Sequence, residues 1–104
     1  MLPIILSLFV SAPVDAAPSF PIVMNMEFCY EDEPCGDTVW TFFEDGTFDS
    51  VSSEGTWWIR GSDFRILYVT GSEYRGTLDP GAGCITGVNR RASGDMGTFE
   101  ACLP

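Results

Sequence analysis

Apolar residues recur at every second position along most of the chain, and turn-forming residues interrupt them at short intervals. Alternation with period two is typical of a β-strand with one buried face, and Gly, Asp, Ser and Pro mark the connections between strands. Eleven glycines and seven prolines supply many such turns. The pattern predicts an all-β fold, a small antiparallel meander that either closes into a barrel or packs as a sandwich.

About seven to eight short strands account for the pattern, and the short connections favour antiparallel neighbours. The longer connections are Glu31–Asp37 and Asn89–Asp95. The strands that we expect are Ile22–Cys29, Thr38–Phe43, Thr47–Ser52, Gly55–Arg60, Phe64–Thr70, Tyr74–Leu78, Cys84–Val88 and Gly97–Cys102.

The clearest predicted hairpin turns at Asp45-Gly46. A two-residue type I′ turn would place Phe43 opposite Phe48. A three-residue loop with the glycine in the left-handed region would instead place Phe42 opposite Phe48, with Trp40 on the same face. We favour the second register because it separates polar from apolar side chains more cleanly. In that register Phe43 points outward.

Several aromatic residues fall on predicted inner faces, where they either fill a narrow barrel or line a ligand pocket. Eight-stranded barrels are often just wide enough for side chains to fill them, so we favour a packed core. On the predicted strand Gly55–Arg60 we expect Trp57 and Ile59 to face inward. The inner set is Trp40, Phe42, Phe48, Trp57, Phe64, Ile66 and Tyr68.

Two aromatic residues, Phe43 and Trp58, fall on predicted outer faces. Exposed aromatic side chains on adjacent strands can mark a binding surface. The alternative is that residues 17–28 or a partner subunit cover them. Together with Trp40, Trp57 and Tyr68, they are our candidate binding residues.

The first residues of the chain indicate a signal peptide. Residues 4–10 form a short apolar run, and Val14-Asp15-Ala16 suits cleavage after Ala16. The run is much shorter than the roughly 20 apolar residues needed to span a bilayer. We therefore expect residues 1–16 to be a signal peptide and 17–104 to be one small secreted or periplasmic domain. The alternatives are that residues 4–10 form a first strand or that the true start lies upstream.

Four cysteines in a short chain with a signal peptide predict two disulfides. A domain of this size has a marginal core, so cross-links would stabilise it. Of the pairings that the cysteines allow, we favour Cys29–Cys35 and Cys84–Cys102, because each pair lies on neighbouring segments. Since the chain has no C-x-x-C spacing and no histidine, we expect no zinc site and no cofactor.

The charge balance is strongly acidic, with 15 Asp and Glu against 5 basic residues and a net charge of −10. That charge opposes binding to nucleic acid or to anionic membranes. All the basic residues are arginines. The absence of His and Lys excludes Ser-His-Asp, Cys-His and Schiff-base chemistry. Carboxylate pairs remain, but short strands leave little room for a substrate cleft, so we expect no enzyme activity.

Two acidic segments, 31–37 and 44–49, carry the oxygen ligands that calcium prefers. Neither has the ligand spacing of a calcium-binding loop, so we favour solvated acidic loops and expect no metal site.

Parts of the chain resemble the calycin group, which includes lipocalins and avidin-like proteins. The residues that carry the resemblance are Trp40-x-Phe42-x-x-Asp45-Gly46-Thr47, Gly55-Thr56-Trp57 and Gly97-Thr98-Phe99-x-Ala101. The resemblance implies a meander barrel and, in lipocalins, binding of hydrophobic ligands. The small secreted bacterial metalloprotease inhibitors of this group are similar in size, compartment and architecture.

These observations favour a non-catalytic secreted binding module that acts through its surface on a protein partner, in the manner of an inhibitor. One alternative is a small-molecule carrier of the calycin type, which requires a cavity between Trp40, Trp57 and Tyr68. Another is a structural or assembly protein of the cell envelope, in which an edge strand near Ile22–Cys29 pairs with a neighbour. The sequence does not indicate an oligomeric state.

Overall fold

The computed structural model describes residues 19–104, and within that range every regular element is a β-strand. The predicted signal peptide, residues 1–16, lies outside the described residues. The strands are β1 (Ile22–Tyr30), β2 (Gly36–Phe42), β3 (Thr47–Asp49), β4 (Glu54–Arg60), β5 (Asp63–Tyr68), β6 (Glu73–Asp79), β7 (Cys84–Arg90) and β8 (Met96–Cys102).

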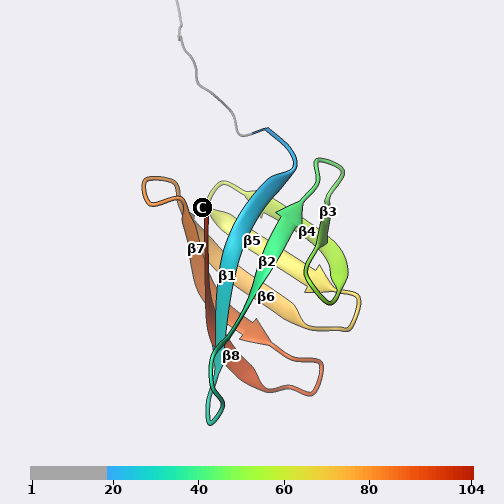
Figure 1. Ribbon diagram of the computed structural model, residues 1–104, viewed down its shortest axis with the longest axis vertical. Helices are drawn as coiled ribbons and strands as arrows, with labels where there is room; N and C mark the ends of the chain where they lie inside the picture. The colour runs from blue at the N-terminus through green and yellow to red at the C-terminus, as the bar shows by residue number, and fades with distance from the viewer. Residues whose placement is uncertain (1–18) are drawn as a thin grey trace, which may run out of the picture.

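The eight strands form one closed antiparallel barrel in sequence order, because β1 pairs with both β2 and β8 (Figure 1). The structure therefore confirms the all-β meander and decides between barrel and sandwich. In the predicted edge segment Ile22–Cys29, residues Ile22–Met24 pair only with β2 and Cys29 only with β8. Residues Asn25–Phe28 of β1 pair with a strand on both sides, which leaves no free edge there for a neighbouring molecule.

Inward-facing residues fill the barrel, as the alternation predicts. Trp40 and Phe48 are completely buried, and Phe64, Ile66 and Phe99 are nearly so. Fully burying one such side chain contributes about 1.5–3 kcal/mol relative to leaving it exposed. The centre of the barrel is therefore a packed core of aromatic and aliphatic side chains.

The hairpin between β2 and β3 has the register that we favoured. Phe42 lies opposite Phe48, and Gly46 has a φ of 90°. A side chain at that φ would be strained, which explains the need for glycine. Phe43 follows β2 in the turn and is half-buried outside the core cluster.

Most strand boundaries agree with the predictions to within two residues, but β3 is shorter than expected. It ends at Asp49, because the Ser50 hydroxyl donates to the carbonyl of Ser53 at 3.0 Å and accepts from its amide at 3.2 Å. Hydroxyl side chains that bond nearby backbone groups favour turns over strand pairing. As a result only Thr41 and Phe42 of β2 pair with β3.

Both predicted disulfides are present. Cys29 at the end of β1 bonds to Cys35 in the following loop, and Cys84 on β7 bonds to Cys102 directly opposite on β8. Two disulfides within the chain are compatible with an extracellular or periplasmic location.

Candidate functional site

The middle of the barrel is closed by Trp40. Its ring lies 5.2 Å from that of Tyr74 and 5.7 Å from that of Phe99, measured between ring centroids. Its indole Nε1 donates a hydrogen bond of 2.7 Å to the Tyr68 hydroxyl. Burial raises the pKa of Tyr68 above its ordinary value, so this hydroxyl stays protonated under neutral conditions. Of these two predicted binding residues, Trp40 is part of the core, whereas Tyr68 is half-buried beside it and lines a hollow of about 380 Å³.

One end of the barrel is open and apolar. A hollow of about 560 Å³ lies there, with a floor of buried side chains from Met24, Phe42, Phe64 and Ile85. We call this hollow the apolar mouth. Its rim, which solvent reaches, consists of Phe20, Ile22, Trp57, Ile59, Leu78 and Leu103.

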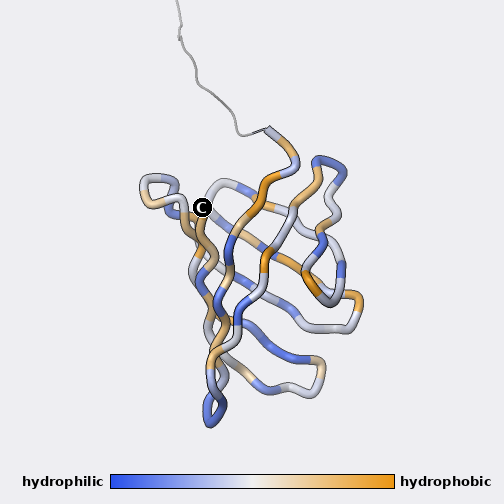
Figure 2. The backbone as a smooth tube through the Cα atoms, viewed as in Figure 1, coloured by the Kyte–Doolittle hydropathy of each residue, from blue (hydrophilic) through white to orange (hydrophobic). Residues whose placement is uncertain are grey.

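The chain ends help to build the mouth. Phe20, just before β1, packs on Trp57 with 5.9 Å between ring centroids. Leu103, just after β8, is held by a 2.9 Å hydrogen bond from its amide to the carbonyl of Gly83. Figure 2 shows the hydrophobic first half of β1 at this end and a hydrophilic loop at its other end.

Trp57 has a fixed position on the rim. Its indole Nε1 donates to the carbonyl of Phe43 at 3.0 Å, and its backbone amide donates to the carbonyl of Gly46 at 2.9 Å. Its ring contacts Phe42 at 5.3 Å between centroids. Because its only polar group is already bonded, the side chain presents an apolar surface to the mouth.

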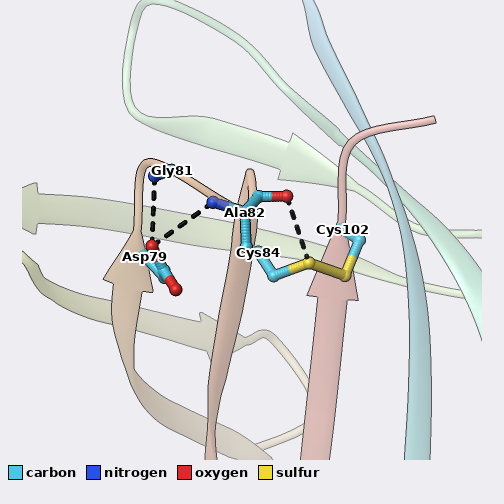
Figure 3. The surroundings of a disulfide bond; sticks show 5 residues. All are labelled: Asp79, Gly81, Ala82, Cys84 and Cys102. Atoms are coloured by element: carbon cyan, nitrogen blue, oxygen red, sulfur yellow. Dashed lines mark hydrogen bonds between the residues drawn. A yellow bond between two sulfur atoms is a disulfide. The ribbon is translucent and has the colours of Figure 1, made fainter.

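The turn between β6 and β7 supports the opposite side of the rim, next to a disulfide (Figure 3). Asp79 Oδ1 accepts hydrogen bonds from the amides of Gly81 and Ala82, at 3.1 and 3.3 Å. The Cys84–Cys102 bond ties this turn to the end of β8. The Sγ of Cys84 lies 3.6 Å from the carbonyl oxygen of Ala82, a van der Waals contact because a disulfide sulfur carries no hydrogen.

The other end of the barrel is polar and is covered by an ion pair between two loops. Arg91 donates to both carboxylate oxygens of Glu33 at 2.8 Å each, and its guanidinium lies 3.7 Å from the centre of the Tyr30 ring. The bond from Arg91 lowers the pKa of Glu33 below its usual value. Beneath this pair lies Asn89, which is 1% exposed. Neither the nitrogen nor the oxygen of its side-chain amide has a hydrogen-bond partner among the described residues.

The predicted outer-face residues, Phe43 and Trp58, are both half-buried. Phe43 forms no aromatic pair within residues 19–104, and its carbonyl instead positions Trp57. Trp58 is half-buried on the outside of β4, where the guanidinium carbons of Arg60 and Arg65 lie 4.3 and 5.4 Å from its ring centre. The sequence thus placed Trp58 on the correct face, and the structure adds the flanking arginines.

Sequence reasoning missed two rim residues and misplaced a third. Phe20 and Leu103 lie outside the alternating segments, so no periodic pattern identifies them. Ile59 was expected to be in the interior but is 38% exposed at the mouth. Alternation gives the face of a residue, but not its height along the barrel.

The described residues contain one cluster with the spacing of a metal site, formed by Cys84, Glu100 and Cys102. Both sulfurs are used in the disulfide, so they are not thiolate ligands. Neither acidic segment, 31–37 or 44–49, gives such a cluster. Within residues 19–104, no helix has the length and apolar character needed to cross a membrane.

Comparison with protein-family models, with curated proteins and with solved structures gave no match.

Proposed function

We propose that the protein is a non-catalytic, secreted binding module that holds a protein partner at its apolar mouth. The observation that carries this proposal is a hollow of about 560 Å³ lined by aromatic and aliphatic side chains at an open barrel end. Protein interfaces have this arrangement, with an apolar centre that receives anchoring side chains and a polar rim around it.

The lining favours a protein partner over a small ligand. Small-molecule sites normally combine apolar walls with a few polar groups that orient the ligand. Of the described residues that line the mouth, only Trp57 has a hydrogen-bonding side chain, and its indole is already bonded to the carbonyl of Phe43. An apolar side chain of a partner needs no such group, because the partner's own fold fixes its orientation.

Composition supports a secreted, non-catalytic role. Two disulfides suit an oxidising compartment, and a net charge of −10 favours solubility. Among residues 19–104, no titratable side chain lines the mouth, so none of them would present an acid, base or nucleophile to a bound partner there. An inhibitor-like action, in which the module blocks its partner's surface, fits these features and the resemblance to small secreted inhibitors.

Capture from the native extracellular fraction, followed by affinity measurement with the purified partner, tests the proposal. Ile59→Asp places a charge on the rim, and we expect it to weaken binding at least about tenfold, since an unpaired charge would be desolvated. Leu67→Asp is the matched control, because Leu67 is 52% exposed on the outside of β5. Equal binding by both variants would refute the proposal.

A carrier of small apolar molecules is the second candidate, favoured by the volume of the mouth, which falls within the roughly 300–1,000 Å³ of ordinary ligand pockets. A saturable change in tryptophan fluorescence on adding long-chain alcohols, lost in Ile59→Asp but kept in Leu67→Asp, would favour the carrier. If the protein binds no such alcohol but binds a protein partner at the mouth, the carrier function is excluded.

A further inference from the structure

Three of the five basic residues gather on one outer face of the barrel. Trp58, Arg65 and Arg75 lie directly opposite one another on β4, β5 and β6, and Arg60 lies two positions beyond Trp58 on β4. The guanidinium groups of Arg60 and Arg65 flank the Trp58 ring. We call these four residues the arginine face.

The arginine face is poorly compensated within its own molecule. Arg65 approaches Asp63 at 3.5 Å, but its Nε is buried without a hydrogen-bond partner among the described residues. Arg60 and Arg75 form no ion pair within residues 19–104. Arg65 and Arg75 lie directly opposite each other on neighbouring strands. Like charges in this arrangement destabilise a sheet.

A second uncompensated row has the opposite sign. On β1, Glu27 lies between Asp37 of β2 and Glu100 of β8, directly opposite both. All three carboxylates are exposed, and none of them forms an ion pair within the described part of the chain. We call these residues the acidic row.

The two surfaces lie on opposite sides of the molecule. The acidic row is centred on β1 and the arginine face on β5, and three strands separate β1 from β5 in either direction around the closed barrel. Neighbouring strands are about 4.8 Å apart, so charges on adjacent strands have the same spacing in both surfaces.

The shapes also suit each other. Beside the acidic row is a surface hollow of about 640 Å³, which the exposed side chains of Val39 and Val51 line together with Glu27, Asp37 and Glu100. On the arginine face, the guanidinium carbons of Arg60 and Arg65 lie 4.3 and 5.4 Å from the centre of the Trp58 ring. An aromatic ring flanked by arginines is complementary to an apolar hollow bordered by carboxylates.

We propose that the arginine face docks on the acidic row of a second copy of this chain. Trp58 would pack over Val39 and Val51, while the arginines pair with the carboxylates. Because the two surfaces lie on opposite sides, each molecule keeps one of them free after docking. The assembly is therefore head-to-tail and grows beyond a dimer. This contact does not use the apolar mouth.

Salt gives the contact a distinctive signature. Two molecules of net charge −10 repel each other at long range, and this repulsion is strongest at very low ionic strength. At about 0.1 M salt the Debye length is about 10 Å, so distant charges are screened while touching pairs still attract. High salt then weakens the pairs as well. We expect association to be strongest near this intermediate ionic strength and weaker on either side.

Sedimentation velocity of the full secreted chain tests the proposal. For the wild type, we expect the average mass to increase with protein concentration and to exceed that of a dimer at concentrations up to about 1 mM. Arg65→Gln/Arg75→Gln removes two of the three charges of the arginine face, and Glu27→Gln/Glu100→Gln removes two of the three charges of the acidic row. Each double variant should remain monomeric alone, since it lacks one of the two surfaces. An equimolar mixture of the two double variants should form a dimer and no larger species. The single intact surface of each variant is occupied in that dimer, so no further molecule can dock.

Matched variants control for charge and folding. Arg90→Gln and Glu44→Gln change the same kinds of charge elsewhere on the surface, and both should associate as the wild type does. If the arginine double variant loses its near-ultraviolet circular dichroism, Arg75→Gln alone replaces it, because this exposed side chain has no ion pair to lose within residues 19–104. A wild type that is monomeric throughout, or double variants that associate like the wild type, would overturn the proposal without affecting binding at the mouth.

Discussion

The indole nitrogen of Trp40 donates a 2.7 Å hydrogen bond to the hydroxyl of Tyr68, across the inside of the barrel. Trp40 is on β2 and Tyr68 is on β5, two strands that do not pair in the sheet. The bond therefore joins two strands that are not neighbours in the barrel, in addition to satisfying a fully buried indole. Trp40 itself is fully buried and fills the centre of the barrel.

Replacing Tyr68 with Phe should destabilise the fold by about 1–3 kcal/mol, because the buried indole N–H of Trp40 loses its acceptor. The aromatic packing would change little, since Phe has nearly the same shape. Urea unfolding followed by tryptophan fluorescence measures the change. Stability equal to the wild type would mean that the hydrogen bond contributes nothing, or that water replaces it.

The two disulfides should differ in their contribution to stability. In the chain-entropy model the Cys84–Cys102 bond, with a sequence separation of 18, contributes about 3 kcal/mol. The Cys29–Cys35 bond, with a separation of 6, contributes about 2 kcal/mol. Thermal unfolding of the two double-serine variants compares them. A larger loss from the shorter loop would show that native contacts, and not loop closure, dominate.

Gly87 should tolerate no side chain, because a Cβ there would collide with the backbone carbonyl of Arg75 and with Gly76 on the facing strand. Overpacking of this kind costs about 1–3 kcal/mol or more. We expect Gly87→Ala to be clearly destabilised in urea. Gly81→Ala is the control, because its Cβ would only reach ordinary contact with Asp79, at 3.4 Å. Equal stability of the two variants would contradict this close approach of the strands.

Asp45 should stabilise the hairpin only when ionised. Its Oδ1 accepts from the Thr47 hydroxyl at 2.6 Å and from the Thr47 amide at 3.0 Å, and these bonds lower its pKa below the usual value. A lowered folded-state pKa gives stability that is present above the unfolded-state pKa, about 3.9, and is lost as the pH falls through the folded-state pKa. Asp45→Ala should therefore be less stable than the wild type at neutral pH, with the gap closing in acid. A gap independent of pH would exclude this role for the charge.

Local patterns in the sequence predicted much of the fold. Alternation identified the eight strands, and the separation of polar from apolar side chains selected the register that places Phe42 opposite Phe48. Neighbouring positions also led to the correct cysteine pairs. These features depend on residues close together in the chain, so a single sequence contains the information.

Features that depend on distant segments were not predictable. The pairing of β1 with β8 joins the two ends of the domain, and no local signal decides between this closure and a sandwich. The mouth has the same origin, because barrel strands tilt and inward-facing residues near a strand end, such as Ile59, reach solvent. The acidic row and the arginine face likewise appear only when three strands are set in register.

Binding at the apolar mouth is the central claim, and the affinity of the purified natural partner for three forms of the protein tests it most directly. Titration calorimetry of the wild type, Ile59→Asp and Leu67→Asp should give equal affinities for the wild type and Leu67→Asp. Ile59→Asp should bind at least about tenfold more weakly, since its charge is desolvated in the contact. Unchanged affinity in Ile59→Asp, or an equal loss in Leu67→Asp, would contradict binding at the mouth.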